Sequence, residues 1–439
     1  MSLTSQKLQR ISDPKTARSV LLCGASVRSL AESAIAAGLR PLCVDFFKDA
    51  DLDGLLESGR GRFVGRINNF TELPAMVRSV RSTIPMLWAG GLENHTDLLR
   101  EIGLHRPLIG TAPDIADQLR DPWILNNWLA KAKIGVPRLA TQPTADADCH
   151  WLQKSVASSG GLGIGLYNSD SSETATHMSH GRYLQEYIDG VPMSALLCAD
   201  HAGVHLVGMS LQLIGWPSLG ASGFLFCGNV GPVDPGEQVT QQVLEAAKIL
   251  VERSGIHGVF GIDFILRQSH AWFLEVNPRV TASHMLYELQ QPGLVIHRHL
   301  AALGWKSGNP RRSLLKHASR PLRALSPVAA RLILWAREDI HVPEGFGNEP
   351  RSAVQIADRP HAGTVVPRSN PFCSILLTAT DCDEIIQKLE LLTDPSSANP
   401  NSSLRTLQTR GYSTRIIACQ LKLLWQKYIQ STTRTEQGF

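Results

Sequence analysis

The sequence predicts an α/β protein with more than one domain, and three observations lead to this expectation. At 439 residues the chain is too long for a single ordinary hydrophobic core. Its 43% apolar and 19% charged residues are typical of a globular protein. Strand and helix patterns alternate near the N-terminus, whereas consecutive strands and a hairpin dominate the middle. We therefore expect a parallel-sheet domain first and a mixed α+β domain after it.

The N-terminal part begins with a βαβ pattern. The elements expected here are strands at 19–24 and 41–45, a helix at 30–37, a strand at 84–91 and a helix at 97–102. Gly24 and Asp45 are compatible with dinucleotide binding, in which Asp45 would contact a ribose. The second and third glycines of the GxGxxG motif are absent, so a structural βαβ unit is favoured. This domain is expected to end near residue 115.

A lysine followed by a glycine-rich loop is the first candidate nucleotide site. A helix capped by Asp121 precedes it, and the strand at 149–154 ends in Lys154. The following Ser/Gly-rich stretch, 155–165, lets backbone N–H groups approach a phosphate, while Lys154 adds a positive charge. Because Lys154 precedes the glycines, this is not a P-loop. A flexible surface turn would have the same composition.

Strands continue beyond this loop and lead into a long helix. The expected elements are strands at 182–190, 195–198 and 204–213, an irregular segment at 215–232 and an amphipathic helix at 239–254. The irregular segment is rich in glycine and proline. An irregular segment of this length inside a compact domain is often a lid or a substrate-binding loop.

The most informative stretch is a predicted hairpin that carries two carboxylates. Strands at 259–266 and 271–276 flank a polar turn, with Asp263 in the first strand and Glu275 and Asn277 at the end of the second. Side chains two apart in a strand share a face, so Glu275 and Asn277 lie together, and pairing in register would add Asp263. Hard oxygen ligands of this kind suit Mg²⁺ that carries phosphates. Arg279 would place a cationic fork beside them.

The C-terminal third is expected to be mixed. The expected elements are helices at 281–291 and 293–303, a basic linker at 306–323, an apolar run at 328–335, strands at 362–367 and 372–378, a helix at 381–392, a low-complexity linker at 394–403 and a helix at 416–429. We divide the chain into domains at 1–115, 116–305 and 306–395, followed by a linker and helical tail at 396–439.

Composition excludes several classes of protein. A net charge of +4 is slight for this length, and no basic stripe interleaved with aromatics predicts nucleic-acid binding. Eight scattered cysteines without a CxxC pair suit a reducing compartment and give no zinc signature. The N-terminus lacks the apolar core of a signal peptide, and no run of about 18 apolar residues predicts a membrane span. We expect a cytoplasmic protein with no membrane or nucleic-acid partner.

The order of these features resembles the ATP-grasp superfamily from about residue 19 to 395. In detail the chain is similar to predicted ATP-dependent carboligases related to biotin carboxylase. The hairpin carries the most specific match, because Asp263, Glu275, Asn277 and Arg279 reproduce the twelve-, two- and two-residue spacing of that group. The resemblance implies an ATP-grasp fold with an N-terminal Rossmann-like domain, a central ATP-grasp domain and a small β-rich C-terminal domain.

The resemblance also implies a role for each matching position. Mg²⁺ (or Mn²⁺) would bind Asp263, Glu275 and Asn277, and Arg279 would bind the substrate carboxylate or acyl-phosphate. Lys154 corresponds to the lysine that binds the phosphates of ATP. Lys154 and Arg279 together correspond to the catalytic residues. The loop that closes over the phosphates corresponds to Ser159, Gly160, Gly161 and Gly163, and the adenine hinge corresponds to Gln185, Glu186, Tyr187 and Ile188.

Three positions depart from the pattern of that group. The helix after Asp121 has Pro122 and Trp123 where many relatives have a lysine that contacts ATP, although Arg120 is a possible substitute. Gln185 stands where many relatives have glutamate. A glutamate that often binds ribose is replaced near residues 191–192, which leaves Asp189 as a candidate. These departures affect the adenosine side of the site more than the Mg²⁺ ligands.

The predicted activity is that of an ATP- and Mg²⁺-dependent ligase. A small-molecule carboxylate would be activated as an acyl-phosphate and joined to an amine, with release of ADP and phosphate; a homodimer is possible. An acid–thiol ligase or a bicarbonate-using carboxylase is an alternative within ligases. Outside them, the rivals are a degenerate nucleotide-binding protein without turnover, favoured by the three departures, and a nicotinamide oxidoreductase, opposed by the missing glycines.

Overall fold

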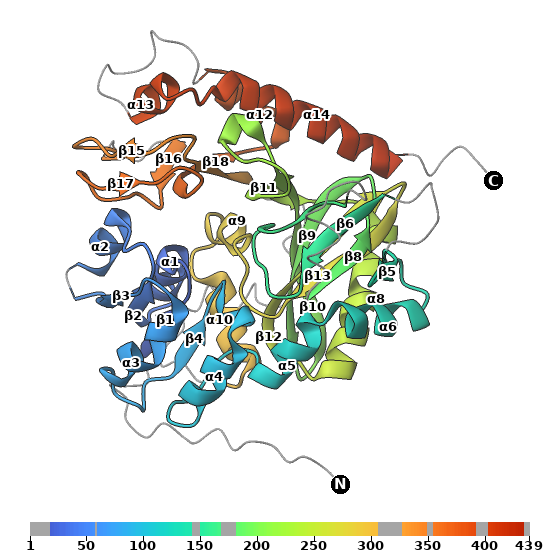
Figure 1. Ribbon diagram of the computed structural model, residues 1–439, viewed down its shortest axis with the longest axis horizontal. Coiled ribbons are helices and arrows are strands. Elements are labelled where there is room, and N and C mark those ends of the chain that lie inside the picture. Colours follow the sequence, from blue (N-terminus) through green and yellow to red (C-terminus); the bar gives the residue numbers. More distant parts are fainter. Residues whose placement is uncertain are drawn as a thin grey trace.

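The computed structural model describes residues 18–57, 59–142, 150–167, 181–305, 327–348, 354–391 and 403–433. Two sheets organise this part of the chain, a four-stranded parallel sheet at the N-terminal side and an eight-stranded antiparallel sheet in the middle (Figure 1). A smaller four-stranded antiparallel sheet lies beside the large one. The predicted α/β class is confirmed, including the change from parallel to antiparallel pairing along the chain.

The N-terminal unit is a parallel sheet covered by short helices. Its elements are β1 (Ser19–Cys23), α1 (Arg28–Ala36), β2 (Arg40–Asp45), α2 (Ala50–Leu56), β3 (Arg62–Arg66), η1 (Phe70–Glu72), α3 (Leu73–Arg78), β4 (Met86–Trp88), η2 (Leu92–Asn94) and α4 (Thr96–Gly103). The strand order is β3-β2-β1-β4, so successive strands are added on one side of β1 and then on the other. The carboxyl ends of β1 and β4 flank this switch point. Ligands of such sheets bind at this switch point.

The next unit begins with helices and the small sheet. Its elements are α5 (Pro113–Arg120), α6 (Pro122–Lys131), β5 (Leu139–Ala140), β6 (Trp151–Ser155), β7 (Gly165–Leu166) and β8 (Arg182–Glu186). Asp121 caps α6 as predicted, because its Oδ1 accepts hydrogen bonds from the backbone N–H groups of Trp123 and Ile124. The order β5-β8-β6-β7 places β8 next to β6, with Lys154 paired with Tyr183 and Trp151 paired with Glu186 at the end of β8.

Strands and helices from the middle to the end of the chain build the large sheet and its cover. The first group is β9 (Val191–Asp200), β10 (Gly203–Ile214), η3 (Pro217–Leu219), β11 (Phe226–Val233), α8 (Glu237–Ser254), β12 (Gly258–Arg267), β13 (His270–Asn277), α9 (His284–Glu288) and α10 (Leu294–Ala302). The second group is β14 (Val328–Trp335), β15 (Ile340–His341), β16 (Val354–Ala357), β17 (Val365–Val366), β18 (Pro371–Ala379), α12 (Cys382–Leu391), α13 (Ser403–Thr409) and α14 (Thr414–Thr433).

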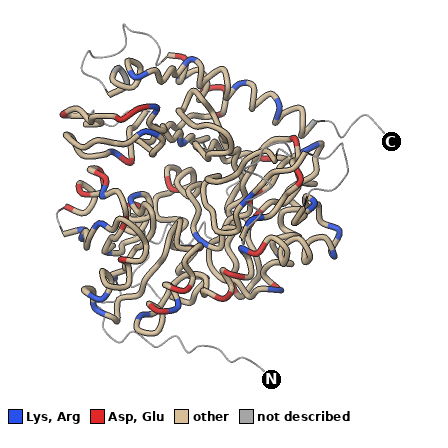
Figure 2. The backbone as a smooth tube through the Cα atoms, viewed as in Figure 1, with Lys and Arg blue, Asp and Glu red and all other residues tan. Residues whose placement is uncertain are grey.

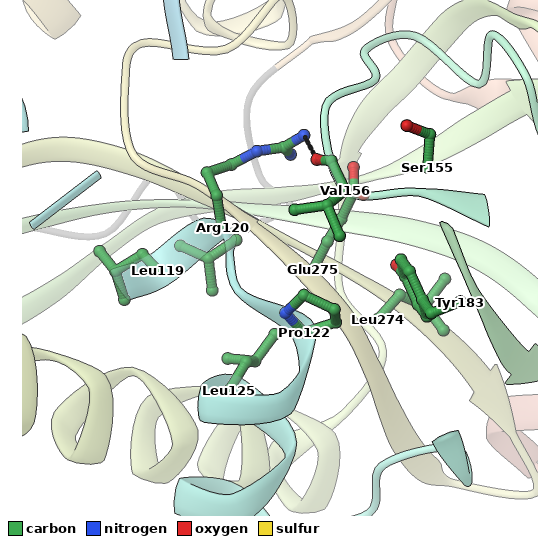
Figure 3. Close-up of a pocket in the computed structure, with 10 residues that line it drawn as sticks. Leu119, Arg120, Pro122, Leu125, Ser155, Val156, Tyr183, Leu274 and Glu275 are labelled. Carbon is green, nitrogen blue, oxygen red and sulfur yellow. Dashed lines mark hydrogen bonds between the residues drawn. The ribbon is translucent and has the colours of Figure 1, made fainter. Parts of the chain in front are cut away.

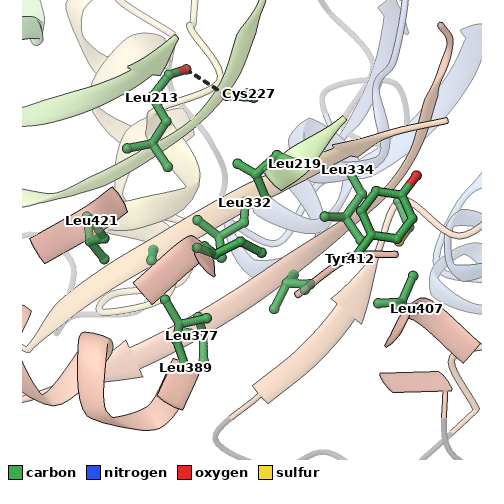
Figure 4. Packing of buried hydrophobic residues seen from close by; sticks show 14 of the residues in the cluster. Leu213, Leu219, Cys227, Leu332, Leu334, Leu377, Leu389, Leu407, Tyr412 and Leu421 are labelled. Atoms are coloured by element: carbon green, nitrogen blue, oxygen red, sulfur yellow. Dashed lines mark hydrogen bonds between the residues drawn. The ribbon is translucent and has the colours of Figure 1, made fainter. Parts of the chain in front are cut away.

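The large sheet has the order β13-β12-β9-β10-β11-β14-β18-β16. It therefore runs across residue 305, which we predicted as a domain boundary, through the pairing of β11 with β14. The boundaries at 115, 305 and 395 stay predictions. A buried apolar cluster continues on both sides of this junction, with Leu213 and Cys227 on one side and Leu332 and Leu377 on the other (Figure 4). The C-terminal strands are thus built onto the central sheet rather than separated from it.

Helix α14 packs along both halves of the sheet. Leu421 belongs to the C-terminal core and Tyr428 to the central one, while Trp425 packs against both. Near its end, the Lys427 Nζ lies 2.9 Å from the Asp189 carboxylate. The predicted helix at the C-terminus is confirmed, and its apolar face is explained by this double contact.

A buried charge cluster joins the N-terminal sheet to the C-terminal strands. Asp358 Oδ1 lies 2.8 Å from the Arg28 Nε of α1, and its Oδ2 lies 2.8 Å from the Arg331 Nη2 of β14. Ser374 donates a further hydrogen bond, and Asp51 accepts from the backbone N–H of Asp358 (3.1 Å). The two guanidinium groups hold the pKa of Asp358 far below its usual range, against the opposing effect of its burial. This carboxylate fixes two distant parts of the chain to each other.

The prediction of an irregular segment at 215–232 is wrong for the second half of that segment. Residues Phe226–Val233 form β11, in the middle of the large sheet. Gly228 has φ +145, and a Cβ added to it would lie 2.1 Å from the Arg331 carbonyl oxygen. Glycine here marks a close approach of two strands and not a loop. The remaining part, which includes η3, forms the connection between β10 and β11.

Smaller differences concern element lengths and unpredicted elements. The helix predicted at 281–291 is shorter and consists of α9, and the strand predicted at 362–367 is shorter and consists of β17. Among the elements that were not predicted are α5 and β16. The basic linker at 306–323, residues 394–402 of the low-complexity linker, and Cys149 lie outside the described residues. Within the described residues no helix is long and apolar enough to cross a membrane. Basic and acidic residues are interspersed along the described chain in the view of Figure 2.

Candidate active site

The predicted hairpin forms and brings the two carboxylates together. Strands β12 and β13 are antiparallel, with Asp263 paired with Glu275 and Gly261 paired with Asn277. Residues Gln268 and Ser269 make the tight turn with φ +51 and +59. Asn277 Nδ2 donates a hydrogen bond to Asp263 Oδ2 (3.0 Å), and the Gln212 Nε2 of β10 donates to Asp263 Oδ1 (2.9 Å). The three predicted oxygen-bearing side chains therefore share one face.

The two carboxylates are close enough to perturb each other. Burial and the neighbouring Glu275 charge raise the pKa of Asp263 above its usual value. The pKa of Glu275 is lowered, because the attraction of Lys154 and then of Arg120 outweighs its burial. Two carboxylates that cannot both ionise easily without a counter-charge form a fitting environment for a divalent cation. The donor set of carboxylate and amide oxygens fits Mg²⁺.

No group of three His, Cys, Asp or Glu side chains is placed to hold a metal ion among the residues that the structure describes. The candidate metal site thus depends on the two carboxylates of the hairpin and the amide oxygen of Asn277. Its ligand roles stay predictions.

Lys154 lies between the carboxylates and the hinge. Its Nζ is 3.8 Å from Glu275 Oε2 and donates a hydrogen bond to Gln185 Oε1 (3.1 Å). The side chain is 5% exposed, so its charge is held in one place by these two partners. Glutamine at 185 keeps an acceptor for this lysine without adding a third carboxylate to the site.

The glycine-rich loop packs against the backbone of Phe224 and Phe226. Gly160, Gly161 and Gly163 have φ values of +64, +80 and +73, which only glycine adopts without strain. The backbone N–H of Phe226 donates to Gly160 O (3.0 Å). A Cβ on Gly161 would lie 1.8 Å from the Phe224 carbonyl oxygen, so this approach requires glycine. The predicted loop therefore forms a wall of the site.

The N-terminal unit supplies a carboxylate that the sequence did not single out. Glu93 lies in η2, after the carboxyl end of β4, and its side chain is fully buried. One oxygen, Oε1, accepts hydrogen bonds from Arg279 Nε (2.9 Å), Arg279 Nη2 (2.6 Å) and Ser159 Oγ (3.1 Å). The predicted carboxylate-binding arginine and the predicted phosphate loop are thus joined through Glu93.

Arg279 stands at the switch point of the parallel sheet. A Cβ added to Gly90 would lie 3.4 Å from Arg279 Cζ, so the glycine leaves room for the guanidinium. Glu93 raises the pKa of Arg279 against the effect of its burial and keeps it charged. The nearest sequence signal for Glu93 was its place just after Gly90-Gly91 at the end of a predicted strand, where ligands of parallel sheets bind.

Arg120 is hydrogen-bonded to the backbone at the beginning of the glycine-rich loop. Its Nη2 donates to the carbonyl oxygens of Ser158 (2.6 Å) and Val156 (3.2 Å) and to Asn94 Oδ1 (3.2 Å). Figure 3 shows the guanidinium directed at Val156 above Glu275, in a small cavity that Pro122 and Tyr183 also line. The sequence offered Arg120 as a substitute for a nucleotide-binding lysine. The structure places it on the loop backbone.

A cavity of about 530 Å³ extends over the hairpin side chains, Lys154, part of the glycine-rich loop and the hinge, whereas Glu93 and Arg120 are not among its described lining residues. The residues predicted for the site that line it are Lys154, Gly160, Gly161, Gln185, Glu186, Tyr187, Ile188, Asp263, Glu275, Asn277 and Arg279. Ser159 and Gly163 are not among its described lining residues. The hinge end is largely apolar, with Leu152, Ile265 and Leu274, and the other end reaches residues 281–283. This size and lining suit a nucleotide-like ligand with polar groups at one end.

The remaining departure concerns Asp189, the candidate ribose ligand. Its side chain is 71% exposed and pairs with Lys427 of α14. Pro192 lines the cavity, whereas Asp189 is not among its described lining residues. A ribose role for Asp189 receives no support from this position.

Comparison with known proteins agrees with this geometry. Residues 119–283 match the model of the ATP-grasp domain. No curated protein matches the sequence. Three similar solved structures are biotin carboxylase from Campylobacter jejuni, N5-carboxyaminoimidazole ribonucleotide synthetase from Thermus thermophilus, and the biotin carboxylase domain of Hydrogenobacter thermophilus 2-oxoglutarate carboxylase with Mg-ADP, ADP and bicarbonate.

The similarity to these structures extends over most of each chain. The first has a TM-score of 0.62 at 15% identity over 85% of this chain and 90% of the other. The second has a TM-score of 0.61 at 15% identity and covers 87% of this chain and 99% of the other. The third has a TM-score of 0.60 at 13% identity and covers 90% of this chain and 98% of the other. At these identities the comparison shows the fold, and the chemistry of the chain has to be argued from its own residues.

Proposed function

Because residues 119–283 form an ATP-grasp domain, we propose that this chain is an ATP- and Mg²⁺-dependent ligase that activates a carboxylate as an acyl-phosphate and joins it to an amine. The observation that carries the proposal is the convergence of three groups in one cavity. These are the carboxylate pair Asp263–Glu275, the buried Lys154, and Arg279 at the carboxyl end of the parallel sheet. A rival nucleotide-binding protein without turnover would not require the last of them.

Each of these groups has a distinct task in the proposed reaction. Bound at Asp263, Glu275 and Asn277, Mg²⁺ would neutralise the charge that develops on the phosphates of ATP. Lys154, held by Gln185 and Glu275, places a fixed positive charge beside the phosphates. Arg279, oriented by Glu93, holds the substrate carboxylate in line with the γ-phosphate. No nucleophilic side chain is needed, because positioning and charge stabilisation supply the catalysis.

The chemistry balances in two steps. A carboxylate oxygen attacks the γ-phosphorus, an O–P bond forms, the bond to the β-phosphate oxygen breaks, and ADP leaves. The amine nitrogen then attacks the acyl carbon, a C–N bond forms and inorganic phosphate leaves, with one proton released from the nitrogen. The loop of Gly160 and Gly161 lies against Phe224 and Phe226 and would keep water from the activated carboxyl group.

The direct test of this function is a screen for ADP release over carboxylates, each offered alone and with an amine. Hydroxylamine in a parallel reaction traps an acyl-phosphate as a hydroxamate. We expect ADP release that requires one carboxylate class and hydroxamate in equal amount. ADP release that no carboxylate stimulates, with no hydroxamate from any of them, would contradict the proposal.

A prediction follows for Glu93, whose role is to orient Arg279. Glu93→Gln removes the negative charge and keeps the shape, so Arg279 loses its counter-ion in a buried place. We expect carboxylate-dependent ADP release to fall by about tenfold to a hundredfold. The nucleotide Kd, measured by equilibrium binding, should change far less. Glu101→Gln on the exposed side of α4 is the matched control, and an equal loss in that variant would contradict the assignment.

A bicarbonate-using carboxylase is the second candidate, and the solved structures favour it. The similar structure from Hydrogenobacter thermophilus is described with bicarbonate, and the one from Campylobacter jejuni is a biotin carboxylase by name. Arg279 would hold bicarbonate in the same way as another small carboxylate. Bicarbonate alone, tested as one member of the ADP-release screen, distinguishes the two functions.

A further inference from the structure

The serine and the glycines of the glycine-rich loop face different parts of the molecule. Gly160 and Gly161 line the large cavity, whereas Ser159 is not among its described lining residues. The Ser159 side chain instead contacts η2 of the N-terminal unit. Its Oγ donates a hydrogen bond to Glu93 Oε1 (3.1 Å) and accepts one from Asn94 Nδ2 (3.0 Å). The hydroxyl group is therefore directed at the residues beside the proposed carboxylate-binding arginine.

The hydroxyl group of Ser159 has no hydrogen left for a phosphate. A serine hydroxyl carries a single hydrogen, and in the structure Glu93 accepts it. A phosphate oxygen could take this hydrogen only by removing it from Glu93, whose side chain is fully buried. Taking a donor from a buried carboxylate costs free energy, because water cannot replace it there. Phosphates are therefore better served by the backbone at Gly160 and Gly161, and the Ser159 side chain has another task.

Glu93 needs a partner that fixes its orientation. The hydrogen bonds from Arg279 Nε (2.9 Å) and Nη2 (2.6 Å) both end on Oε1, the same oxygen that accepts from Ser159. Oε2 is buried and has no hydrogen-bond partner in the part of the chain that the structure describes. The terminal torsion of a glutamate is broad, so the side chain alone does not select the oxygen that faces Arg279. Ser159 makes this selection, because it is bonded to that oxygen.

A chain of hydrogen bonds extends this contact to the beginning of the loop. Asn94, which donates to Ser159, accepts a hydrogen bond at Oδ1 from Arg120 Nη2 (3.2 Å). The same nitrogen of Arg120 donates to two backbone carbonyl oxygens at the beginning of the loop. The order is Arg120, Asn94, Ser159, Glu93 and Arg279, and we call it the Ser159 chain. One set of hydrogen bonds thus docks the loop on η2 and orients Arg279.

We propose that Ser159 is a positioning residue for the carboxylate substrate, and that it couples the docked glycine-rich loop to Arg279 through Glu93. The inference rests on the proposed ligase function, in which Arg279 holds that substrate. A nucleotide in contact with Gly160 and Gly161 keeps the loop docked, so the Ser159 chain orients Arg279 when the nucleotide is in place. Bound nucleotide and bound carboxylate should then strengthen each other's binding by the same factor.

The first test separates the two substrates in steady-state kinetics of the full chain. The KM for Mg-ATP and the KM for the carboxylate found in the ADP-release screen are measured for Ser159→Ala, each at a saturating concentration of the other substrate. Because the hydroxyl donates to a charged group, we expect the carboxylate KM to rise by about tenfold. The Mg-ATP KM should stay within about twofold of that of the unchanged chain. A Mg-ATP KM that rises as much as the carboxylate KM, or no change in either, would overturn the inference.

Two further variants of the loop control this measurement. Ser159→Thr keeps the hydroxyl group and should restore the carboxylate KM to within about threefold of the unchanged chain. Ser158→Ala removes the neighbouring hydroxyl, which donates to Ser155 O (3.1 Å) within the same segment. A general loosening of the loop by this change should move both KM values together and leave their ratio unchanged. A ratio that shifts in Ser158→Ala as it does in Ser159→Ala, or no recovery in Ser159→Thr, would contradict the assignment.

The second test needs no turnover. Phenylglyoxal attacks the deprotonated guanidine group of arginine, so a guanidinium that is held by a carboxylate reacts slowly. The modification rate of Arg279 is followed by peptide mass spectrometry in the full chain with Mg²⁺ and a non-hydrolysable ATP analogue. We expect Arg279 to react several-fold faster in Ser159→Ala than in the unchanged chain, and at the unchanged rate in Ser158→Ala. Equal rates in Ser159→Ala and the unchanged chain would overturn the link between Ser159 and Arg279.

Failure of the proposed ligase function has a different signature. It is seen in the unchanged chain, as ADP release that no carboxylate stimulates and as missing hydroxamate. The phenylglyoxal rates then still decide whether Ser159 orients Arg279. Carboxylate-stimulated ADP release in the unchanged chain, together with an effect of Ser159→Ala on the Mg-ATP KM alone, would instead support the function and contradict the inference.

Discussion

Replacing Glu275 by glutamine is expected to abolish nearly all carboxylate-dependent ADP release while the protein stays folded. Glu275 is paired with Asp263 across the hairpin and lies 3.8 Å from Lys154, so it is common to the metal site and the phosphate site. Glutamine has the same shape and removes the charge that a divalent cation needs. We expect a loss on the order of a thousandfold in turnover. The same variant should need a much higher Mg²⁺ concentration for half-maximal nucleotide binding.

Glu245→Gln is the matched control, because Glu245 is exposed on α8 and the substitution removes the same charge. Circular dichroism and thermal unfolding should agree for both variants and the unchanged protein. Turnover of Glu275→Gln within a few-fold of the unchanged protein, at limiting Mg²⁺, would show that the hairpin is not the metal site.

Replacing Asp358 by asparagine is expected to have the largest effect on stability. The variant leaves Arg28 and Arg331, which are 3% and 12% exposed, without their shared counter-ion. Breaking a buried ion pair by removing one partner costs about 4 kcal/mol of unfolding free energy. Urea unfolding of the two proteins at pH 7 measures this difference. Asp53→Asn in α2 is the control, because this carboxylate is 32% exposed and pairs with the exposed Lys48 (3.6 Å), so the loss should stay below about 1 kcal/mol.

The effect of Asp358 should also depend on pH in a definite direction. The pKa of Asp358 is lowered in the folded state, so the unfolded chain takes up this proton first as the pH falls. Its contribution is therefore fully present above the unfolded pKa of about 4 and is lost as the pH falls below that value. The difference between the unchanged protein and Asp358→Asn should be constant from pH 8 to about 5 and shrink below about 4. A difference that grows on acidification would contradict this account.

The candidate metal site could be predicted from the sequence because its geometry is local. A strand period of two and a short polar turn place Glu275 and Asn277 together and bring Asp263 opposite them. The glycines at 160, 161 and 163 predicted a loop after Lys154, and their positive φ values, which favour glycine, agree with that prediction. The parallel sheet at the N-terminus followed from one βαβ pattern.

Contacts between distant segments could not be predicted in this way. Glu93 meets Arg279 across 186 positions, and Asp358 meets Arg28 across 330, and neither pairing leaves a periodic signal in the sequence. Strand β11 was missed because Gly228 and Pro232 are usual in loops. Here the glycine is required by the close approach of β14, a strand that follows about a hundred residues later in the chain.

The most direct test of the central claim, that this chain activates a carboxylate through its acyl-phosphate, is an oxygen-transfer measurement. The carboxylate found in the ADP-release screen is labelled with ¹⁸O, and the phosphate released after a full reaction is examined by mass spectrometry. The reaction proposed for Lys154, Arg279 and the Asp263–Glu275 pair predicts one ¹⁸O atom in each molecule of released phosphate. Phosphate released with ADP but free of ¹⁸O would mean that water, and not the carboxylate, attacks the γ-phosphate.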